Sequence, residues 1–340
     1  MSRDAALAGE IAALHGLRPD RIASVEGGGS VNRVFVVHSE GPRFAVRFPI
    51  DPLRKDEFEV EAWCLTRAAA HGIPSPRVIA RGEVREIPYL IQSFVEGVPG
   101  ASGGSDDPWK WLARYARTMH TIDITHDAPD GLFSRFGRDL PAAWRAHLAY
   151  NLEQLVETDP LLRLAVYRPD QQTRLRSAIE RLGDVELDFG LCHGDLSPRN
   201  LIFPRSGPPV LIDWGTAAVG PVPYGDLLPV VKAHHATGEP SYTELPAFAE
   251  TLGRSLPEGR HTLDDLMLLE ALDLVRWAID QRPGPRRRDR TVLPRSDPEP
   301  VRVVVGCLPE VAFGFALRDT STGHCSCTCR RCRRIRGGLW

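Results

Sequence analysis

The residues with the clearest chemical potential lie in one short stretch, which holds two carboxylates and one carboxamide at the ends of predicted strands. Asp195 stands in the segment HGDLSPRN, Asn200 ends that segment, and Asp213 follows the next predicted strand. This order matches the phosphoryl-transfer arrangement in which one Asp accepts a hydroxyl proton while an Asn and a second Asp hold magnesium. Magnesium prefers oxygen ligands, and one or two protein groups suffice because phosphate oxygens and water complete its octahedron. The spacing therefore predicts Asp195 as the catalytic base and Asn200 and Asp213 as metal ligands.

The same stretch resembles the catalytic core of the aminoglycoside phosphotransferase and related small-molecule kinase family, over roughly residues 20 to 283. In that family an HGD motif, an Asn and an Ile-Asp pair follow in this order, and Asp226 matches a structural Asp further along. The resemblance implies a protein-kinase-like fold and transfer of the γ-phosphate of ATP or GTP, with Mg2+, to a hydroxyl group. It also implies that His193 supports the catalytic loop through hydrogen bonds.

A glycine-rich segment near the N-terminus is the candidate for covering the phosphates of the nucleotide. It reads EGGGSVN and includes Gly28, Gly29, Ser30 and Asn32 between two predicted strands. Glycines allow close backbone approach, and backbone amides in such a turn can bind anions. The Ser30 and Asn32 pattern resembles the family's version of this loop, although an ordinary hairpin turn would also use these residues.

The segment RFAVRF is the candidate for the adenine and phosphate side of a strand. Alternation puts Phe44, Val46 and Phe48 on one face and Ala45 and Arg47 on the other. The resemblance implies that Ala45 lies beside the adenine and that Arg47 replaces the phosphate-pairing lysine of protein kinases. This is a departure from the protein-kinase pattern, because a guanidinium offers a planar fork in place of a compact ammonium. A solvated cation on an edge strand is the alternative.

Glu61 lies on the same predicted helical face as Phe58, Ala62 and Leu65. Its position resembles that of the helix glutamate that pairs with the phosphate-binding cation, so we expect a pair between Glu61 and Arg47.

The end of the last N-terminal strand resembles the hinge whose backbone meets the adenine edge. The residues concerned are Gln92, Ser93, Phe94 and Val95. Their side chains alone indicate only a buried strand.

The elements around these residues predict an α+β fold of the protein-kinase-like two-lobe type. Five short strands and one helix over residues 21–95 indicate a small antiparallel sheet, and mainly helical patterns follow a Gly- and Ser-rich linker. Trp109, Leu112, Ala116 and Met119 form one apolar stripe, and Thr262 with Asp265 suggests a capped start for the last helix. The predicted domains are an N-terminal nucleotide-binding lobe over 1–97, a helical lobe over 98–283 and an Arg-, Pro- and Cys-rich, disordered tail over 284–340.

Acceptor contacts in this family come from the helical lobe, where the sequence is least informative. Glu270 and Asp273 belong to a group of acidic residues on one late helix. They would suit a cationic aminosugar, and equally they fit a solvated helix face. An aminoglycoside-like acceptor is favoured over homoserine, choline, a macrolide or a sugar.

Two other classes of function remain open, a protein kinase and a catalytically idle nucleotide-binding protein. Protein kinases carry the motifs HRD and DFG and an activation loop that ends in APE, whereas this chain has HGD and DWG. The presence of Asp195, Asn200 and Asp213 together argues against an idle pocket.

Composition indicates a globular protein without a general affinity for nucleic acid or membranes. The chain of 340 residues is 42% hydrophobic and 25% charged, with a net charge of -2. No signal peptide or membrane-spanning run is recognised, so a cytoplasmic location is expected. Four of the seven cysteines crowd the tail at a spacing too tight for the usual paired zinc knuckles. The oligomeric state is not indicated.

Overall fold

The computed structural model describes residues 2–25, 32–38, 41–50, 57–103 and 107–280. The chain divides into two compact units. The first comprises Met1–Ser134, Asp188–Val230 and Thr243–Gly253, and the second comprises Arg135–Leu187, Val231–Tyr242 and the residues from Arg254 on. The lobe boundaries expected at residues 97 and 283 stay a prediction, and the proposed tail lies outside the described residues.

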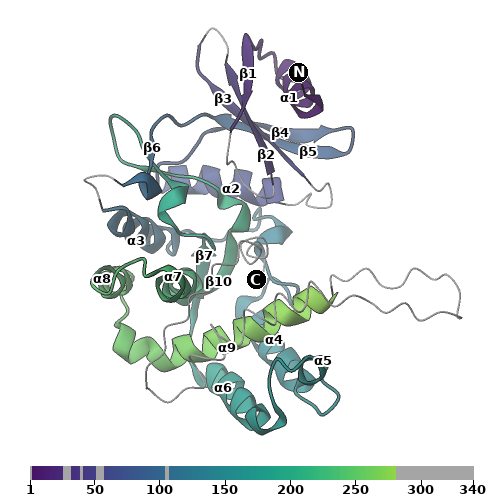
Figure 1. Cartoon of the computed structure of the whole chain (residues 1–340), viewed down its shortest axis with the longest axis vertical. Helices are drawn as coiled ribbons and strands as arrows, with labels where there is room; N and C mark the ends of the chain where they lie inside the picture. The colour runs from purple at the N-terminus through teal and green to yellow at the C-terminus, as the bar shows by residue number, and fades with distance from the viewer. Residues whose placement is uncertain (1, 26–31, 39–40, 51–56, 104–106, 281–340) are drawn as a thin grey trace, which may run out of the picture. The chain divides into compact units, whose positions relative to one another are not determined.

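The first unit contains a five-stranded antiparallel sheet with the strand order β1-β2-β3-β5-β4 (Figure 1). Its strands are β1 (Arg21–Ser24), β2 (Asn32–His38), β3 (Phe44–Pro49), β4 (Val78–Val84) and β5 (Ile87–Ser93). β-Branched and aromatic residues dominate these segments, as is usual for strands that bury one face or both. All five predicted strands are therefore confirmed.

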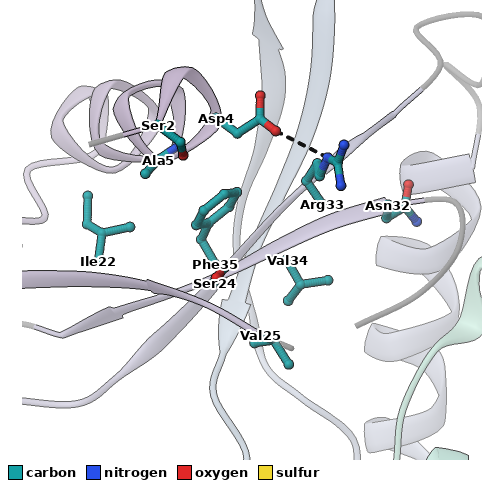
Figure 2. A pocket seen from close by; sticks show the side chains of 10 residues that line it. All are labelled: Ser2, Asp4, Ala5, Ile22, Ser24, Val25, Asn32, Arg33, Val34 and Phe35. Carbon is teal, nitrogen blue, oxygen red and sulfur yellow. Dashed lines mark hydrogen bonds and ion pairs between the residues drawn. The ribbon is translucent and has the colours of Figure 1, made fainter. Parts of the chain in front are cut away.

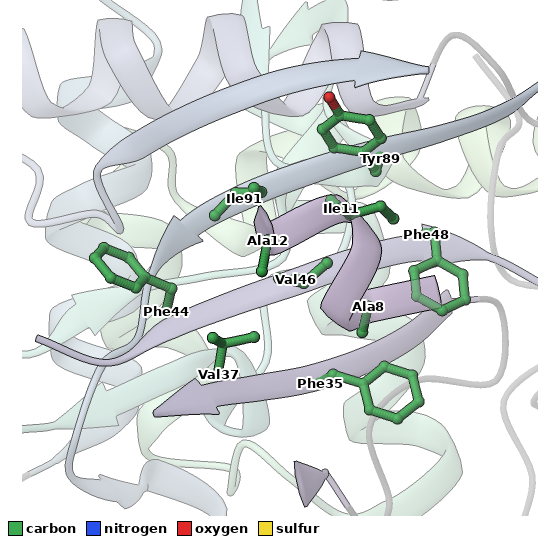
Figure 3. Packing of buried hydrophobic residues seen from close by; sticks show 10 residues of the cluster. All are labelled: Ala8, Ile11, Ala12, Phe35, Val37, Phe44, Val46, Phe48, Tyr89 and Ile91. Carbon is green, nitrogen blue, oxygen red and sulfur yellow. The ribbon is translucent and has the colours of Figure 1, made fainter. Parts of the chain in front are cut away.

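Helix α1 (Arg3–Leu14) packs on one face of this sheet (Figure 3) and was not predicted from the sequence. Ala8, Ile11 and Ala12, spaced three and four residues apart, are fully buried against the sheet. Their partners include Phe44, Val46 and Phe48, together with Phe35, Val37, Tyr89 and Ile91. The predicted alternation in β3 is thus confirmed, and Ala45 and Arg47 point away from α1.

The other elements of the first unit include helix α2 (Glu57–Ala70), which contacts β4, β5 and the 3-10 turn η5 (Trp214–Thr216). Its buried face carries Phe58, Glu61 and Leu65, and the chain leaves it through Gly72 at φ +77. Helix α3 (Pro108–Met119) buries the predicted apolar stripe and packs against α8 (Glu244–Thr251). The remaining strands are β6 (Val98–Pro99), β7 (Asp188–Cys192), β8 (Leu201–Phe203), β9 (Val210–Leu211) and β10 (Ala218–Val222), and the further 3-10 turns are η1 (Gly100–Ser102), η2 (Asp130–Leu132) and η4 (Pro198–Asn200).

The second unit is helical. It contains α4 (Leu140–Gln154), α5 (Pro160–Arg163), η3 (Pro169–Gln171), α6 (Gln172–Asp184) and α9 (Leu256–Asp280), whereas α7 (Tyr224–Thr237) contributes residues to both units. The start expected for the last helix at Thr262 is wrong, because α9 begins at Leu256. Asp265 instead receives two hydrogen bonds from Arg181, at 2.9 and 2.6 Å, so an ion pair explains the acidic residue that resembled a cap.

The fold class is the predicted one, with an antiparallel sheet in the N-terminal region and a helical C-terminal part. None of the helices that the structure describes is both long and apolar enough to cross a membrane.

Candidate active site

The candidate catalytic loop runs from the end of β7 to the start of β8, and side chains donate three hydrogen bonds to the Asp195 carboxylate and one to its backbone carbonyl. Nη2 of Arg199 donates to both carboxylate oxygens of Asp195, at 2.7 and 2.6 Å. Nδ2 of Asn200 donates to one of the same oxygens at 3.0 Å and to the backbone carbonyl of Asp195 at 2.8 Å. Gly194 has φ +76, and a side chain there would collide with the carbonyl of Thr216, so only glycine fits this turn. The loop thus presents a carboxylate whose orientation is fixed by its own neighbours.

Asn200 and Asp213 are brought together by the hairpin of β8 and β9. Leu201 pairs with Leu211, and the amide of Ile212 donates to the carbonyl of Asn200 at 2.9 Å, so Asp213 follows directly beside this position. Because Nδ2 of Asn200 faces Asp195, its Oδ1 is left without a hydrogen-bond partner among the described residues. Asp213 adopts φ 65 and ψ 58, a left-handed conformation that Asp tolerates better than most residues. These two oxygen donors fit a hard cation such as Mg2+.

Arg47 lies between two carboxylates, one on α2 and one on Asp213, which was predicted as a metal ligand. Nη1 of Arg47 contacts Oε1 of Glu61, and its Nη2 donates to Oδ1 of Asp213 at 2.9 Å. Arg47 and Glu61 are both buried, whereas Asp213 is half exposed. The expected pair of Arg47 and Glu61 is therefore present, and the alternative of a solvated cation at Arg47 is wrong.

Burial changes the acid-base properties of this pair. Removal from water raises the pKa of Glu61 to about 7, and the charge of Arg47 only partly offsets that effect. Burial alone would lower the pKa of Arg47, but Glu61 and Asp213 together raise it above its ordinary value. Arg47 consequently stays a cation. Its Nε is buried without a hydrogen-bond partner among the described residues, so this nitrogen could donate to a ligand.

His193 and Asp226 join the catalytic loop to the neighbouring elements of the first unit. Oδ1 of Asp226 accepts from the amides of His193 and Gly194, at 2.9 and 3.2 Å, and its Oδ2 lies 2.9 Å from Nε2 of His120. Nε2 of His193 lies 3.1 Å from the carbonyl of Ile212, and Thr216 donates to the carbonyl of His193 at 3.0 Å. These bonds are of the kind expected for residues that support the loop.

Three residues of this site carry contacts that the sequence did not indicate. Arg199 belongs to the quoted motif, and its spacing of four from Asp195 was the only signal for a pair. His120 and Thr216 are brought to the loop by tertiary structure, His120 from a position 106 residues before Asp226. Sequence spacing holds no information on such contacts.

The residues expected around the nucleotide are described only in part. Gly28, Gly29 and Ser30 lie outside the described residues, and Asn32 is the buried first residue of β2. Ala45 faces Gln92 across β3 and β5, on a buried stretch of the sheet. Oε1 of Gln92 has no hydrogen-bond partner among the described residues.

The other hinge residues contact the chain around them. Oγ of Ser93 accepts from the amide of Arg77 at 2.9 Å, and the amide of Phe94 donates to the carbonyl of Arg43 at 3.0 Å. Val95 follows, half-buried, after the end of β5. Their positions at the end of β5 are compatible with the expected hinge.

Glu270 and Asp273 lie on α9 in the second unit, and both have partners there. Glu270 forms an ion pair with Lys232. Asp273 accepts from Nδ2 of Asn151 at 2.9 Å and lies 2.8 Å from Nε2 of His147. They therefore belong to networks inside this unit and are not a simple solvated face.

A surface hollow of about 420 Å³ lies beside α1, β1 and β2 (Figure 2). The ion pair of Arg33 with Asp4, at 3.2 Å, lies at this hollow, which Asn32 also lines. Its lining includes none of Arg47, Asp195, Asn200 or Asp213, so it is separate from the predicted catalytic, metal-binding and phosphate-binding residues.

Comparison with known proteins identifies relatives along much of the chain. The profile of the phosphotransferase enzyme family matches residues 21–266. An aminoglycoside 3'-phosphotransferase of Streptomyces fradiae is 31% identical over 157 residues, which are 44% of this chain and 50% of that protein. The chain thus spans about half the length of the curated relatives it matches.

Two solved structures illustrate the likeness in fold. A macrolide 2'-phosphotransferase from Brachybacterium faecium has a TM-score of 0.56 at 23% identity, over 82% of this chain and 93% of that one. A spectinomycin phosphotransferase, solved with ADP and spectinomycin, has a TM-score of 0.54 at 15% identity, over 89% and 96%. Because the family profile matches most of its length, this chain belongs to the phosphotransferase enzyme family.

Proposed function

We propose that this protein is a small-molecule O-phosphotransferase, which moves the γ-phosphate of ATP or GTP to a hydroxyl group of its acceptor. The observation that carries the proposal is the loop before β8, where Asn200 donates to the Asp195 carboxylate, together with the hairpin of β8 and β9, which brings Asn200 beside Asp213. Membership in the phosphotransferase enzyme family supports the same reaction class.

The nucleotide and its metal would be held by residues of the first unit. Asn200 Oδ1 and the Asp213 carboxylate would hold Mg2+, which supplies charge neutralisation on the phosphate oxygens. Arg47, anchored by Glu61, would donate to phosphate oxygens through its unpartnered Nε. The glycine-rich segment with Gly28, Gly29, Ser30 and Asn32 would cover the phosphates, while Ala45 and residues 92–95 would meet the adenine. ADP bound to the spectinomycin phosphotransferase supports the choice of a nucleotide donor.

Asp195 would perform the proton transfer. Its carboxylate is held by Arg199 and Asn200, so one oxygen can be directed at the acceptor hydroxyl and take its proton as the hydroxyl oxygen attacks. His193 and Asp226 would keep the loop in this geometry through the bonds to its backbone. Positioning and charge stabilisation account for most of the rate in this class of reaction.

The acceptor is proposed to resemble an aminoglycoside, which would make the protein an antibiotic-resistance enzyme. The relative from Streptomyces fradiae supports this choice. Glu270 and Asp273 would attract amino groups of the acceptor, in addition to the contacts that they already make with Lys232 and His147. Oε2 of Glu270 has no hydrogen-bond partner among the described residues, so one carboxylate oxygen is not used by the pair.

The experiment that tests the proposal is nucleotide consumption in Mg2+ by the purified protein, across a panel of aminoglycosides, macrolides, homoserine, choline and sugars. We expect turnover with an aminoglycoside, and a loss of about a hundred- to ten-thousandfold in Asp195→Asn with nucleotide affinity retained. Nucleotide consumption that persists unchanged in Asp195→Asn would show that Asp195 is not the catalytic base. Nucleotide binding without turnover on any acceptor would favour the idle binding protein.

A further inference from the structure

Arg199 donates hydrogen bonds to the Asp195 carboxylate, on which the proposed reaction depends, yet most N–H donors of Arg199 are unused. Both hydrogen bonds to Asp195 come from the single nitrogen Nη2. Nε and Nη1 have no partner among the described residues, so three of the five N–H donors of the guanidinium remain available. The side chain of Arg199 is 61% exposed, which leaves those donors accessible.

The contact of Arg199 with Asp195 contributes little to stability. Water screens exposed ion pairs, and holding two side chains in one geometry costs conformational entropy. Asp195 is also held by Asn200, through both its carboxylate and its backbone carbonyl, and the amide of the preceding Gly194 is fixed by Asp226. A cation placed here therefore matters more for the charge near Asp195 than for holding the loop together.

The position of Asp195 limits where the transferred group can be. The acceptor hydroxyl must hydrogen-bond to Asp195. The phosphorus that this hydroxyl attacks lies about 3 Å from the hydroxyl oxygen before reaction. A guanidinium already bonded to Asp195 then lies within reach of the equatorial oxygens of that phosphoryl group. During transfer negative charge is spread over those oxygens, and an arginine is well suited to bind them.

We propose that Arg199 is a further catalytic residue, which binds the transferring phosphoryl group through Nε and Nη1 while Nη2 keeps its contact with Asp195. This inference rests on the proposed phosphotransferase function. The bond between the acceptor oxygen and the γ-phosphorus forms as the bond from that phosphorus to the β-phosphate oxygen breaks. The hydroxyl proton goes to Asp195, and the electron pair leaves with the nucleoside diphosphate. Arg199 gains and loses no proton, and its charge balances that of the three equatorial oxygens.

Arg47 is not a substitute for this cation. Its two terminal nitrogens contact Glu61 and Asp213, on the side of the site that would hold the metal. Among the residues that the structure describes, Arg199 is the cation that contacts the Asp195 carboxylate.

The test compares binding of ADP with binding of ADP plus aluminium fluoride, in Mg2+, because the fluoride complex mimics the transferring phosphoryl group and no acceptor is required. In the wild-type protein we expect aluminium fluoride to tighten ADP binding. In Arg199→Gln we expect ADP alone to bind within about threefold of its wild-type affinity. We expect the tightening by aluminium fluoride to fall by at least about tenfold, because an arginine that binds the transition state can raise the rate by roughly a thousandfold. Arg199→Lys keeps the positive charge but loses the planar pair of donors, so its tightening should lie between those of the wild-type protein and Arg199→Gln.

Arg168→Gln is the matched control. Arg168 is 68% exposed and pairs with Asp170 at 3.0 Å, and it is not among the residues proposed to bind nucleotide, metal or acceptor, so its replacement should leave the tightening unchanged. A role limited to orienting Asp195 would affect turnover and leave the tightening in Arg199→Gln as in wild type, and that result overturns the inference alone. Wild-type protein that binds ADP but shows no tightening would overturn both the inference and the proposed function.

Discussion

Nη2 of Arg47 lies 2.9 Å from Oδ1 of Asp213, although the two residues are 166 positions apart in the chain. The same guanidinium also contacts Glu61 on α2. One arginine thus connects the sheet, a helix and the proposed metal position. A lysine has a single nitrogen with which to serve two carboxylates, so the exchange from lysine to arginine suits this arrangement.

Removal of Arg47 should affect both stability and nucleotide binding. Arg47→Met leaves the buried Glu61 without its cation, and we expect a loss of about 3 to 5 kcal/mol in the free energy of unfolding. The double variant Arg47→Met with Glu61→Met should recover most of that stability but not the affinity for ATP. Urea denaturation and calorimetric titration measure the two effects. If the double variant binds ATP as wild type does, Arg47 has no part in nucleotide binding.

Glu61 should make stability depend on pH. Its pKa in the folded protein is raised to about 7, so between its ordinary value and about 7 the folded protein holds a proton that the unfolded chain has released. The free energy of unfolding should therefore fall as pH rises through this window, by at most about 1.4 kcal/mol per pH unit from this group. Below the ordinary value of a glutamate both states are protonated, and the contribution is constant and fully present.

The check on this dependence is Glu61→Gln, which cannot ionise. Urea denaturation of both proteins at several values from about pH 5 to about pH 8 should show a wild-type stability that declines relative to the variant. Equal slopes for the two proteins would mean that Glu61 is ionised throughout.

Asp226 should be important to both the loop and its activity. In Asp226→Ala the amides of His193 and Gly194 and the ring of His120 lose their shared acceptor inside the first unit. Each buried donor left unpaired costs about 1 to 3 kcal/mol, so we expect a clear drop in melting temperature and in turnover. Asp170→Ala, which removes an exposed carboxylate paired with Arg168, is the control and should change neither. Unaltered turnover in Asp226→Ala would refute a supporting role.

The second unit should depend on the buried pair of Arg276 and Asp159. Arg276 donates to both oxygens of Asp159, at 3.1 and 2.9 Å, and its Nε donates to Asn151 at 3.2 Å. Arg276→Ala should lower the free energy of unfolding by about 3 to 5 kcal/mol, because Asp159 stays buried without its cation. Arg181→Ala removes a half-exposed arginine from its pair with Asp265 and should lower the free energy of unfolding much less. Urea denaturation of both variants measures the two losses. Similar losses in both variants would contradict this difference.

Local patterns in the chain were sufficient for the five strands of the N-terminal sheet and for the order of the proposed catalytic groups, but not for helix α1. The alternation of Phe44, Val46 and Phe48 predicted which face of β3 is covered, because side chains in a strand point to opposite sides in turn. The short segment from Asp195 to Asp213 predicted the loop and hairpin that carry the site, since their spacing is set by a few residues of chain. Family resemblance then predicted the pairing of Glu61 with Arg47.

Contacts between distant parts of the chain could be known only from the folded structure. The start of α9 was misplaced because Asp265 resembles a capping residue locally, whereas its partner Arg181 is 84 positions away. The bridge from Arg47 to Asp213, the bond of His120 to Asp226 and the use of one nitrogen of Arg199 for both oxygens of Asp195 were likewise not readable from spacing. Periodicity reports which side of an element is buried, but the partner it meets depends on how the elements pack, because hydrogen bonds and ion pairs are decided by distances of a few ångströms in space.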